Sequence, residues 1–197
     1  MNGDCYAKGE RAWMAWTQRL RGAILGPFLQ LCGRAHVSPD HITFVSLLCG
    51  LAFWPLWFLS APLALGALAL HVLLDGIDGP LARHLGVASR RGSFTDTLSD
   101  QAVVTTTTIA LMTAGDLGIV PGALYIYVYA VVVAFAMVRN SLEIPYAWLL
   151  RPRFLIYVWI AIETTWQTGL LDPLVWGCSA LLALKMLSGF VKLRGRL

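Results

Sequence analysis

Charged residues are scarce in this sequence. Of its 197 residues, 13% are charged and 57% are hydrophobic, whereas about a quarter of the residues in an average soluble domain are charged. This composition excludes a soluble domain of ordinary kind and indicates an integral membrane domain.

Other patterns are missing as well. The first forty residues lack the apolar core and the small-residue cleavage site of a signal peptide. No folded nucleic-acid recognition motif is present, so topology and anionic lipid headgroups explain the net charge of +4 better than nucleic acid does. Paired metal-ligand spacing is absent from the cysteines, so we expect free thiols that mostly pack in the interior, at Cys5, Cys32, Cys49 and Cys178.

Long apolar segments predict six transmembrane helices. The uncharged run over residues 42–74 is too long for one span, and Ser60-Ala61-Pro62 is a turn signal that divides it into two. Four further apolar segments follow, at residues 94–113, 117–138, 154–171 and 173–191. We therefore predict an all-α fold in which residues 41–197 form a six-helix transmembrane domain.

We predict that residues 1–40 form a cytoplasmic interfacial segment before the first span. Apolar residues recur there at helical spacing, with arginines among them, at Ala12, Trp13, Trp16, Leu20 and Ile24. This pattern is typical of an amphipathic helix that lies on the membrane surface. The alternative is a poorly ordered start, because chain termini often fray.

Basic residues are absent from three of the connecting loops, those near Ser60, Asp116 and Asp172. All fifteen lysines and arginines fall before the first span, after the second, between the fourth and fifth, or near the C-terminus. By the positive-inside rule, both termini and the segment after the second span lie on the cytoplasmic side.

That segment is unusually acidic. Four of the eleven acidic residues fall within 26 positions, in the sequence DGIDGPLARHLGVASRRGSFTDTLSD from Asp75 to Asp100. A carboxylate near hydrocarbon is costly unless it is paired, hydrated or bound to a metal. On helices, Asp75 and Asp78 share one face, and so do Asp96 and Asp100. Two carboxylate pairs would then face each other across a helix hairpin.

This arrangement predicts a metal site. The four carboxylates carry four negative charges, and we expect them to lack basic partners because no lysine alternates among them. Two divalent cations would balance the charge, and carboxylate oxygens suit Mg2+ or Mn2+. Gly79 and Ala82 leave one face without bulk, so that a diphosphate could bridge two ions there. A single aspartate such as Asp96 could instead cap a helix, but caps have no reason to recur on both arms.

The same stretch resembles the signature of the CDP-alcohol phosphatidyltransferase family. Every fixed position of the signature is present, as Asp75-x-x-Asp78-Gly79-x-x-Ala82-Arg83, eight residues, and Gly92-x-x-x-Asp96-x-x-x-Asp100. The six predicted spans and the chain length also resemble the family. A weaker resemblance to the family's pre-helix element lies at Ser38-Pro39-Asp40 and Thr43.

The resemblance implies an enzyme that transfers a phosphatidyl group from CDP-diacylglycerol to a small alcohol at the cytoplasmic side of the bilayer, with release of CMP. It implies that two Mg2+ or Mn2+ ions are held by Asp75, Asp78, Asp96 and Asp100, and that Asp100 also accepts the proton of the attacking alcohol. It places the CDP-linked substrate against Asp75, Asp78, Gly79, Ala82, Arg83 and Gly92. Homodimers are usual in the family.

The acceptor alcohol stays open. Arg139, Arg151 and Arg153 lie between the fourth and fifth spans and could bind a phosphate on the acceptor, because arginine suits bidentate phosphate recognition. The alternative is that they only set topology. The first interpretation favours an inositol phosphate or glycerol 3-phosphate. Inositol, serine, choline or a CDP-aminoalcohol donor are the alternatives within the family.

A divalent-cation transporter is the alternative from a different class. It would require acidic residues repeated through the depth of the membrane. Here they cluster at one end, and Glu163 is the only other acid expected within a span, with no partner apparent. His71, one helical turn before Asp75, is expected to be a packed histidine or a supporting partner of the metal ligands.

Overall fold

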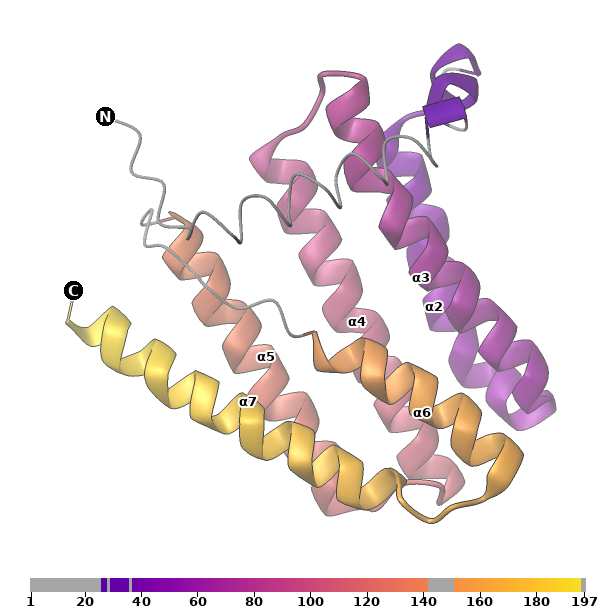
Figure 1. Ribbon diagram of the computed structural model, residues 1–197, viewed down its shortest axis with the longest axis vertical. Helices are drawn as coiled ribbons and strands as arrows, with labels where there is room; N and C mark the ends of the chain where they lie inside the picture. Colours follow the sequence, from indigo (N-terminus) through magenta and orange to yellow (C-terminus); the bar gives the residue numbers. More distant parts are fainter. Residues whose placement is uncertain (1–25, 28, 36, 142–150, 196–197) are drawn as a thin grey trace.

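The computed structural model describes residues 26–27, 29–35, 37–141 and 151–195, and these are helical apart from short connections (Figure 1). The helices in chain order are α2 (Pro39–Leu59), α3 (Ala61–His84), α4 (Arg90–Ala114), α5 (Ile119–Ser141), α6 (Pro152–Trp166) and α7 (Leu171–Arg194). No strand occurs in these ranges, which confirms the all-α prediction. The amphipathic helix expected over residues 12–24 lies outside the described residues.

Four of these helices are long and apolar enough to cross a membrane: α2, α3, α5 and α7. Helix α4 does not qualify, because its first half carries Arg90, Arg91, Asp96 and Asp100 and its second half includes a run of four threonines. Helix α6 has 15 residues, or about 22 Å at 1.5 Å per residue, which is less than the roughly 30 Å of a hydrocarbon core. The structure thus supports a membrane protein with four candidate spans, and six spans remain a prediction.

Local signals set the helix ends near the acidic segment. The Ser38 hydroxyl caps α2 by accepting a hydrogen bond from the His41 amide at 3.2 Å, and Pro39 occupies the first turn. Ser89 caps α4 by accepting from the Gly92 amide at 3.0 Å. Between α2 and α3, Ser60 is extended, so the turn predicted at Ser60-Ala61-Pro62 is confirmed.

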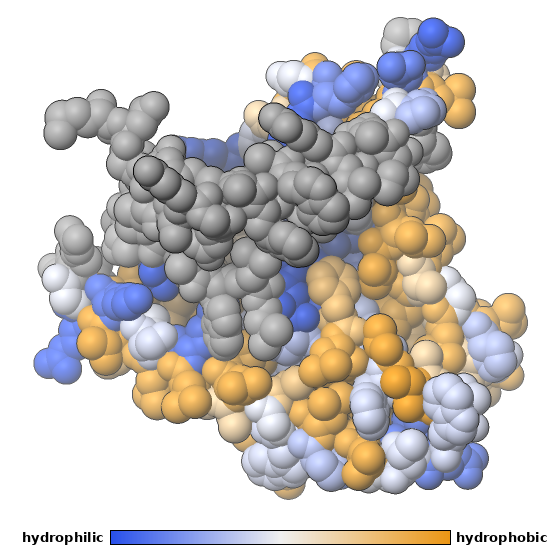
Figure 2. All heavy atoms as spheres, viewed as in Figure 1, coloured by the Kyte–Doolittle hydropathy of each residue, from blue (hydrophilic) through white to orange (hydrophobic). Residues whose placement is uncertain are grey.

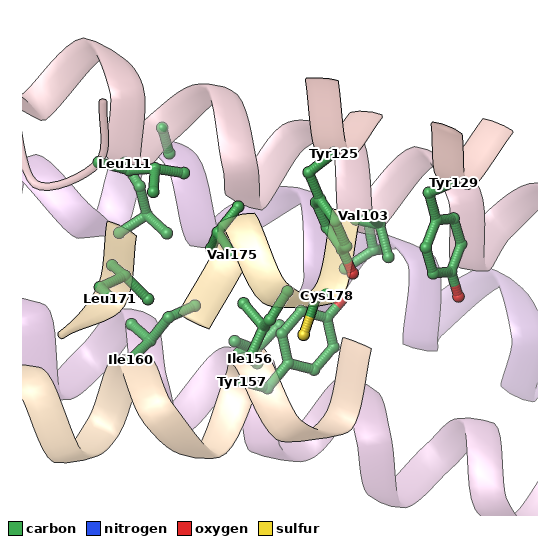
Figure 3. Close-up of a cluster of buried hydrophobic side chains, with 14 of the residues drawn as sticks. Val103, Leu111, Tyr125, Tyr129, Ile156, Tyr157, Ile160, Leu171, Val175 and Cys178 are labelled. Atoms are coloured by element: carbon green, nitrogen blue, oxygen red, sulfur yellow. The ribbon is translucent and has the colours of Figure 1, made fainter. Parts of the chain in front are cut away.

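The helices pack so that the acidic hairpin is held on both sides. Helix α2 packs against α3 and α4, α5 packs against α7, and α6 contacts α7 and α3. Gly50 allows α2 to approach α4 closely, because a Cβ at this position would lie 2.3 Å from a methyl group of Val103. Figure 3 shows the interior between α4, α5, α6 and α7, where Tyr125, Tyr157 and Cys178 come from three different helices.

The outside of the bundle is apolar over its middle. Figure 2 shows hydrophobic side chains over the visible face of α2 and α3, with hydrophilic side chains toward the ends. Many large apolar side chains are exposed in the middle of the helices, including Leu48, Leu70, Leu181 and Leu184. A surface of this kind is stable against lipid rather than water. Cys32 and Cys178 are free and buried, as expected of packing thiols.

Candidate metal centre

Three aspartates from α3 and α4, which both pack against α2, lie close together. Asp75 comes from the second half of α3, and Asp96 and Asp100 come from the first half of α4. One carboxylate oxygen of each lies within 4.8 Å of the other two, and all three side chains are half-buried. The hairpin therefore brings together carboxylates that are up to 25 residues apart in the sequence.

Asp78 lies beside this group but is engaged elsewhere. Its Oδ2 accepts a hydrogen bond from the Thr43 hydroxyl of α2 at 2.6 Å, and its Oδ1 accepts one from the Gly79 amide at 2.6 Å. Asp78 is buried, so these two neutral donors supply the partners that a buried carboxylate needs. Thr43, in the weakly matched pre-helix element, thus supports an aspartate of the signature directly.

A basic residue completes the centre. Arg153, the second residue of α6, donates from Nη2 to Asp75 Oδ2 at 2.9 Å and forms a second ion pair, through Nη1, with Asp100 Oδ2. Its side chain is only 1% exposed. The expectation that the four carboxylates lack basic partners is therefore wrong for Asp75 and Asp100. The partner comes from another helix, 78 residues from Asp75, where no local spacing could indicate it.

The residues of this centre fit a hard divalent cation. The donors are carboxylate oxygens, the ligand type that Mg2+ and Mn2+ prefer. Asp100 Oδ1 is buried and has no hydrogen-bond partner among the described residues, so it has free capacity to bind an ion. Three carboxylates and one guanidinium carry a net charge of two negative units, which one divalent cation balances.

A cavity of about 430 Å³ opens beside the carboxylates, between the starts of α2 and α4 and the end of α3. It brings together five of the six residues predicted to bind the CDP-linked substrate, namely Asp78, Gly79, Ala82, Arg83 and Gly92. Asp75, the sixth, is not among the lining residues. Asp96 lines the cavity too, so the cavity and the carboxylate centre share a wall.

Sequence reasoning did not assign the other polar residues that line this cavity. They include Ser38, Asp40 and Thr43 at the start of α2, and Ser89 and Ser93 near the start of α4. The first three belong to the weakly resembling pre-helix element. Ser89 and Ser93 had no signal beyond their place between two predicted site residues.

A second cavity, of about 340 Å³, adjoins the first and runs along α2 and α4. The two share Asp40, Thr43, Ser89 and Gly92. The second is also lined by the apolar residues Phe44 and Leu47 on one side and by Arg91, Thr95 and Ser99 of α4. Phe44 is 60% exposed on the outside of the bundle. A polar cavity is thus continuous with a groove that has an apolar wall.

The three arginines considered for the acceptor lie at the end of α5 and around the start of α6. Arg139 is buried near the end of α5, Arg151 is exposed immediately before α6, and Arg153 is the arginine on the carboxylates. Residues 142–150, between Arg139 and Arg151, lie outside the described residues.

Two other polar residues prove to be structural. His71 is buried, and its Nδ1 lies 2.9 Å from the Ser46 hydroxyl, so it is a packed, hydrogen-bonded histidine. Glu163 was expected in mid-span without a partner, which is wrong. It lies in the last turn of α6 and accepts hydrogen bonds from the Thr168 hydroxyl at 2.6 Å and the Gly169 amide at 2.5 Å. The apolar run over residues 154–171 predicted a longer helix, but α6 ends at Trp166.

This chain is similar to known proteins in sequence. The CDP-alcohol phosphatidyltransferase family model matches residues 36–188. An uncharacterized protein of Aquifex aeolicus is 38% identical over 89 residues, which are 43% of this chain and 45% of that protein. A phosphatidylinositol phosphate synthase of Cutibacterium acnes is 32% identical over 83 residues, 40% of this chain and 39% of the synthase. The alignments thus span less than half the length of these curated relatives.

The fold is also found in a solved structure. The crystal structure of Mycobacterium tuberculosis phosphatidylinositol phosphate synthase with CDP-DAG bound superposes with a TM-score of 0.73. The match covers 85% of this chain and 92% of that one, at 16% sequence identity. At this identity the likeness establishes the shared fold.

Proposed function

This chain belongs to the CDP-alcohol phosphatidyltransferase family, and we propose that it transfers a phosphatidyl group from CDP-diacylglycerol to an alcohol that carries a phosphate, releasing CMP. The observation that carries this proposal is the group formed by Asp75, Asp96 and Asp100 at the edge of a cavity lined by the rest of the signature.

We assign the CDP part of the donor to the 430 Å³ cavity. Gly79 has no side chain to occupy the cavity, and the Arg83 guanidinium provides a positive charge for a diphosphate. The adjoining groove beside Phe44 and Leu47 provides an apolar surface for the diacylglycerol part. The relative from Mycobacterium tuberculosis, whose structure contains CDP-DAG, supports this choice of donor.

We assign divalent-cation binding, by Mg2+ or Mn2+, to Asp75, Asp96 and Asp100, with Asp78 serving a second ion together with Asp96. When bound, the ions neutralise the diphosphate and stabilise the charge that develops as CMP leaves. Asp100 has a further role in this proposal. Its Oδ1 has no partner among the described residues and can accept the proton of the attacking hydroxyl.

For the acceptor, we propose an inositol phosphate that is recognised through its phosphate by Arg139, Arg151 and Arg153. The relatives named phosphatidylinositol phosphate synthase favour inositol phosphate over glycerol 3-phosphate. Arginine also gives the bidentate contacts that suit a phosphate. Inositol, serine and choline are alternative acceptors that a CMP-release assay with CDP-diacylglycerol would detect. A CDP-aminoalcohol donor is the other alternative, and it would have to be supplied in place of CDP-diacylglycerol.

We further propose that all six helices cross the bilayer, with the site and both termini on the cytoplasmic side, and that the protein is a homodimer. The short α6 and the charged start of α4 would then be shielded by the neighbouring helices, since α6 contacts α7 and α3 and α4 packs against α2. Cysteine labelling in sealed vesicles and the mass of the detergent-purified protein test these two points.

A CMP-release assay tests the function. The full chain, purified and reconstituted in lipid, receives CDP-diacylglycerol, Mg2+ or Mn2+, and each candidate alcohol separately, with Asp100→Asn as the inactive control. We expect CMP release with inositol phosphate and little with the unphosphorylated alcohols. Release only with glycerol 3-phosphate, inositol, serine or choline would replace the acceptor, and no release with any alcohol would contradict the proposed reaction.

A further inference from the structure

Arg153 has two roles that conflict in the arrangement seen here. The proposed function uses it to bind the phosphate of the acceptor. In the structure its side chain is 1% exposed, and its terminal nitrogens are engaged by Asp75 and Asp100. A phosphate arriving from solvent could not reach the guanidinium while these ion pairs persist.

The partners of Arg153 are also the proposed metal ligands. Asp75 and Asp100 belong to the group of three carboxylates whose oxygens lie within 4.8 Å of one another. A divalent cation held by this group would lie close to the guanidinium in a weakly polar interior, where two positive charges repel strongly. The cation and Arg153 therefore compete for the same two carboxylates.

The guanidinium is only partly satisfied where it lies. Its Nε is buried without a hydrogen-bond partner among the described residues. A buried donor without a partner costs stability, and a phosphate could engage the planar fork of donors more completely. Because arginine has a long side chain and Arg153 lies in the first turn of α6, a change of rotamer can re-aim the guanidinium while the helix stays in place.

We propose that Arg153 exchanges partners during the catalytic cycle, an inference that rests on the proposed function. Without a metal, the guanidinium neutralises Asp75 and Asp100. When a divalent cation takes these carboxylates, the guanidinium is released and binds the anionic group of the acceptor. Metal binding thereby prepares the acceptor site, so a phosphate binds tightly only after the metal.

The first test measures metal affinity without turnover. The full chain in lipid nanodiscs is titrated with Mn2+, followed by calorimetry and by the electron paramagnetic resonance signal of free Mn2+. Removing the competing charge in Arg153→Gln should tighten Mn2+ binding about tenfold or more. Arg151→Gln is the matched control, because it removes an exposed arginine two residues away, and it should bind Mn2+ like wild type. Equal or weaker binding by folded Arg153→Gln would overturn the exchange.

The second test uses the wild-type protein and inorganic phosphate as the probe. Phosphate should bind about tenfold tighter with saturating Mg2+ than with a chelator, since the exchange makes Arg153 available. Arg153→Gln should lose most of this gain, which separates the effect from phosphate bound directly by the metal. Arg153→Lys, which keeps a charge near the carboxylates, should lie between the two and serves if Arg153→Gln does not fold. Metal-independent phosphate affinity, or the same gain in Arg153→Gln, would contradict the proposal.

The two tests also separate this inference from the acceptor assignment. If the CMP assay identifies an unphosphorylated acceptor, the proposed function fails, whereas the competition between Mn2+ and Arg153 is still decided by the titration. If CMP release with inositol phosphate is confirmed and the Mn2+ affinities are equal, only the exchange fails.

Discussion

The acidic residues at the two ends of the helix bundle have opposite surroundings. At one end, Asp75, Asp96 and Asp100 crowd within 4.8 Å of one another and share a single guanidinium. At the other end, each acidic residue stands alone and accepts a hydrogen bond from a neutral donor. The Trp57 indole donates to Asp116 at 2.7 Å, and the Gly118 amide donates to Asp172 at 2.9 Å.

The difference shows which acidic residues of an apolar chain indicate a cation site. Each acid at the far end fastens one loop to a neighbouring element, and its charge is shared with one or two hydrogen bonds. The three crowded carboxylates repel one another, so the arrangement calls for positive charge beyond that of Arg153. Crowding, rather than the mere presence of an acid, therefore indicates cation chemistry. The described acids also gather at the two ends, which does not fit the series through the membrane that a cation transporter predicts.

The largest effect expected concerns the metal. Thorough chelation should abolish CMP release, and Mg2+ or Mn2+ should restore it, because the crowded carboxylates and the donor diphosphate are both negative. The assay is CMP release before and after chelation, with thermal unfolding as the control for intact protein. Full turnover in the chelated enzyme would remove the metal from the proposal and with it the significance of the crowded end.

Asp75→Asn and Asp100→Asn should both abolish turnover but differ in binding. Loss of Asp75 should weaken metal and CDP-substrate binding together, whereas loss of the proposed base Asp100 should spare more of it. Calorimetric titration with Mn2+ and with the CDP-linked donor measures both. Equal binding by the two variants would show that these roles are assigned wrongly.

Arg151→Gln should lower acceptor affinity about ten- to hundredfold, by removing a charge-assisted bond of roughly 1.5–3 kcal/mol. The loss should show in the acceptor KM or in kcat/KM, while the Kd of the donor changes little. Arg151→Lys should recover only part, since an ammonium lacks the planar fork. If Arg151 only sets topology, correctly inserted Arg151→Gln keeps wild-type kinetics. That result would favour an unphosphorylated acceptor over a phosphorylated one.

The smallest effects come from a matched pair, one variant at each end. Thr43→Val removes the neutral donor to Asp78, and Trp57→Phe removes the neutral donor to Asp116. Each should cost about 1 kcal/mol of stability or somewhat more, seen as a lower Tm in detergent. Only Thr43→Val should also slow CMP release, by about tenfold, with Thr43→Ser close to wild type. An equal loss of turnover in Trp57→Phe would mean that the two ends are not functionally distinct.

Features encoded by neighbouring residues were predictable from the sequence. The length of the apolar runs and the Ser60-Ala61-Pro62 turn predicted where the six helices lie. The spacing of the aspartates predicted that Asp75 meets Asp96 and Asp100 across the hairpin, whereas Asp78, expected in the same group, is bonded to Thr43 and Gly79. Arg153 was not assigned to the carboxylates, because its pairing with Asp75 depends on how α6 packs against α3. Tertiary contacts of this kind leave no periodic pattern.

A different limit explains the error at Glu163. The apolar run continues past the end of α6, so composition extended the helix. The backbone instead turns at Gln167 and Gly169, both with positive φ, and Glu163 accepts hydrogen bonds from this turn. Hydropathy therefore shows how far an apolar segment extends, whereas the turn residues determine where the helix ends.

The groove along α2 and α4 has a consequence for how the enzyme would encounter its donor. Phe44, on the wall of this groove, faces the outside of the bundle, and the groove is continuous with the cavity through Asp40, Thr43, Ser89 and Gly92. A lipid donor can therefore enter sideways from the bilayer while its acyl chains stay in hydrocarbon. The concentration that governs its capture is then two-dimensional: the mole fraction of donor among the surrounding lipids. Diluting the donor with neutral lipid at constant bulk concentration slows such an enzyme, whereas adding buffer does not.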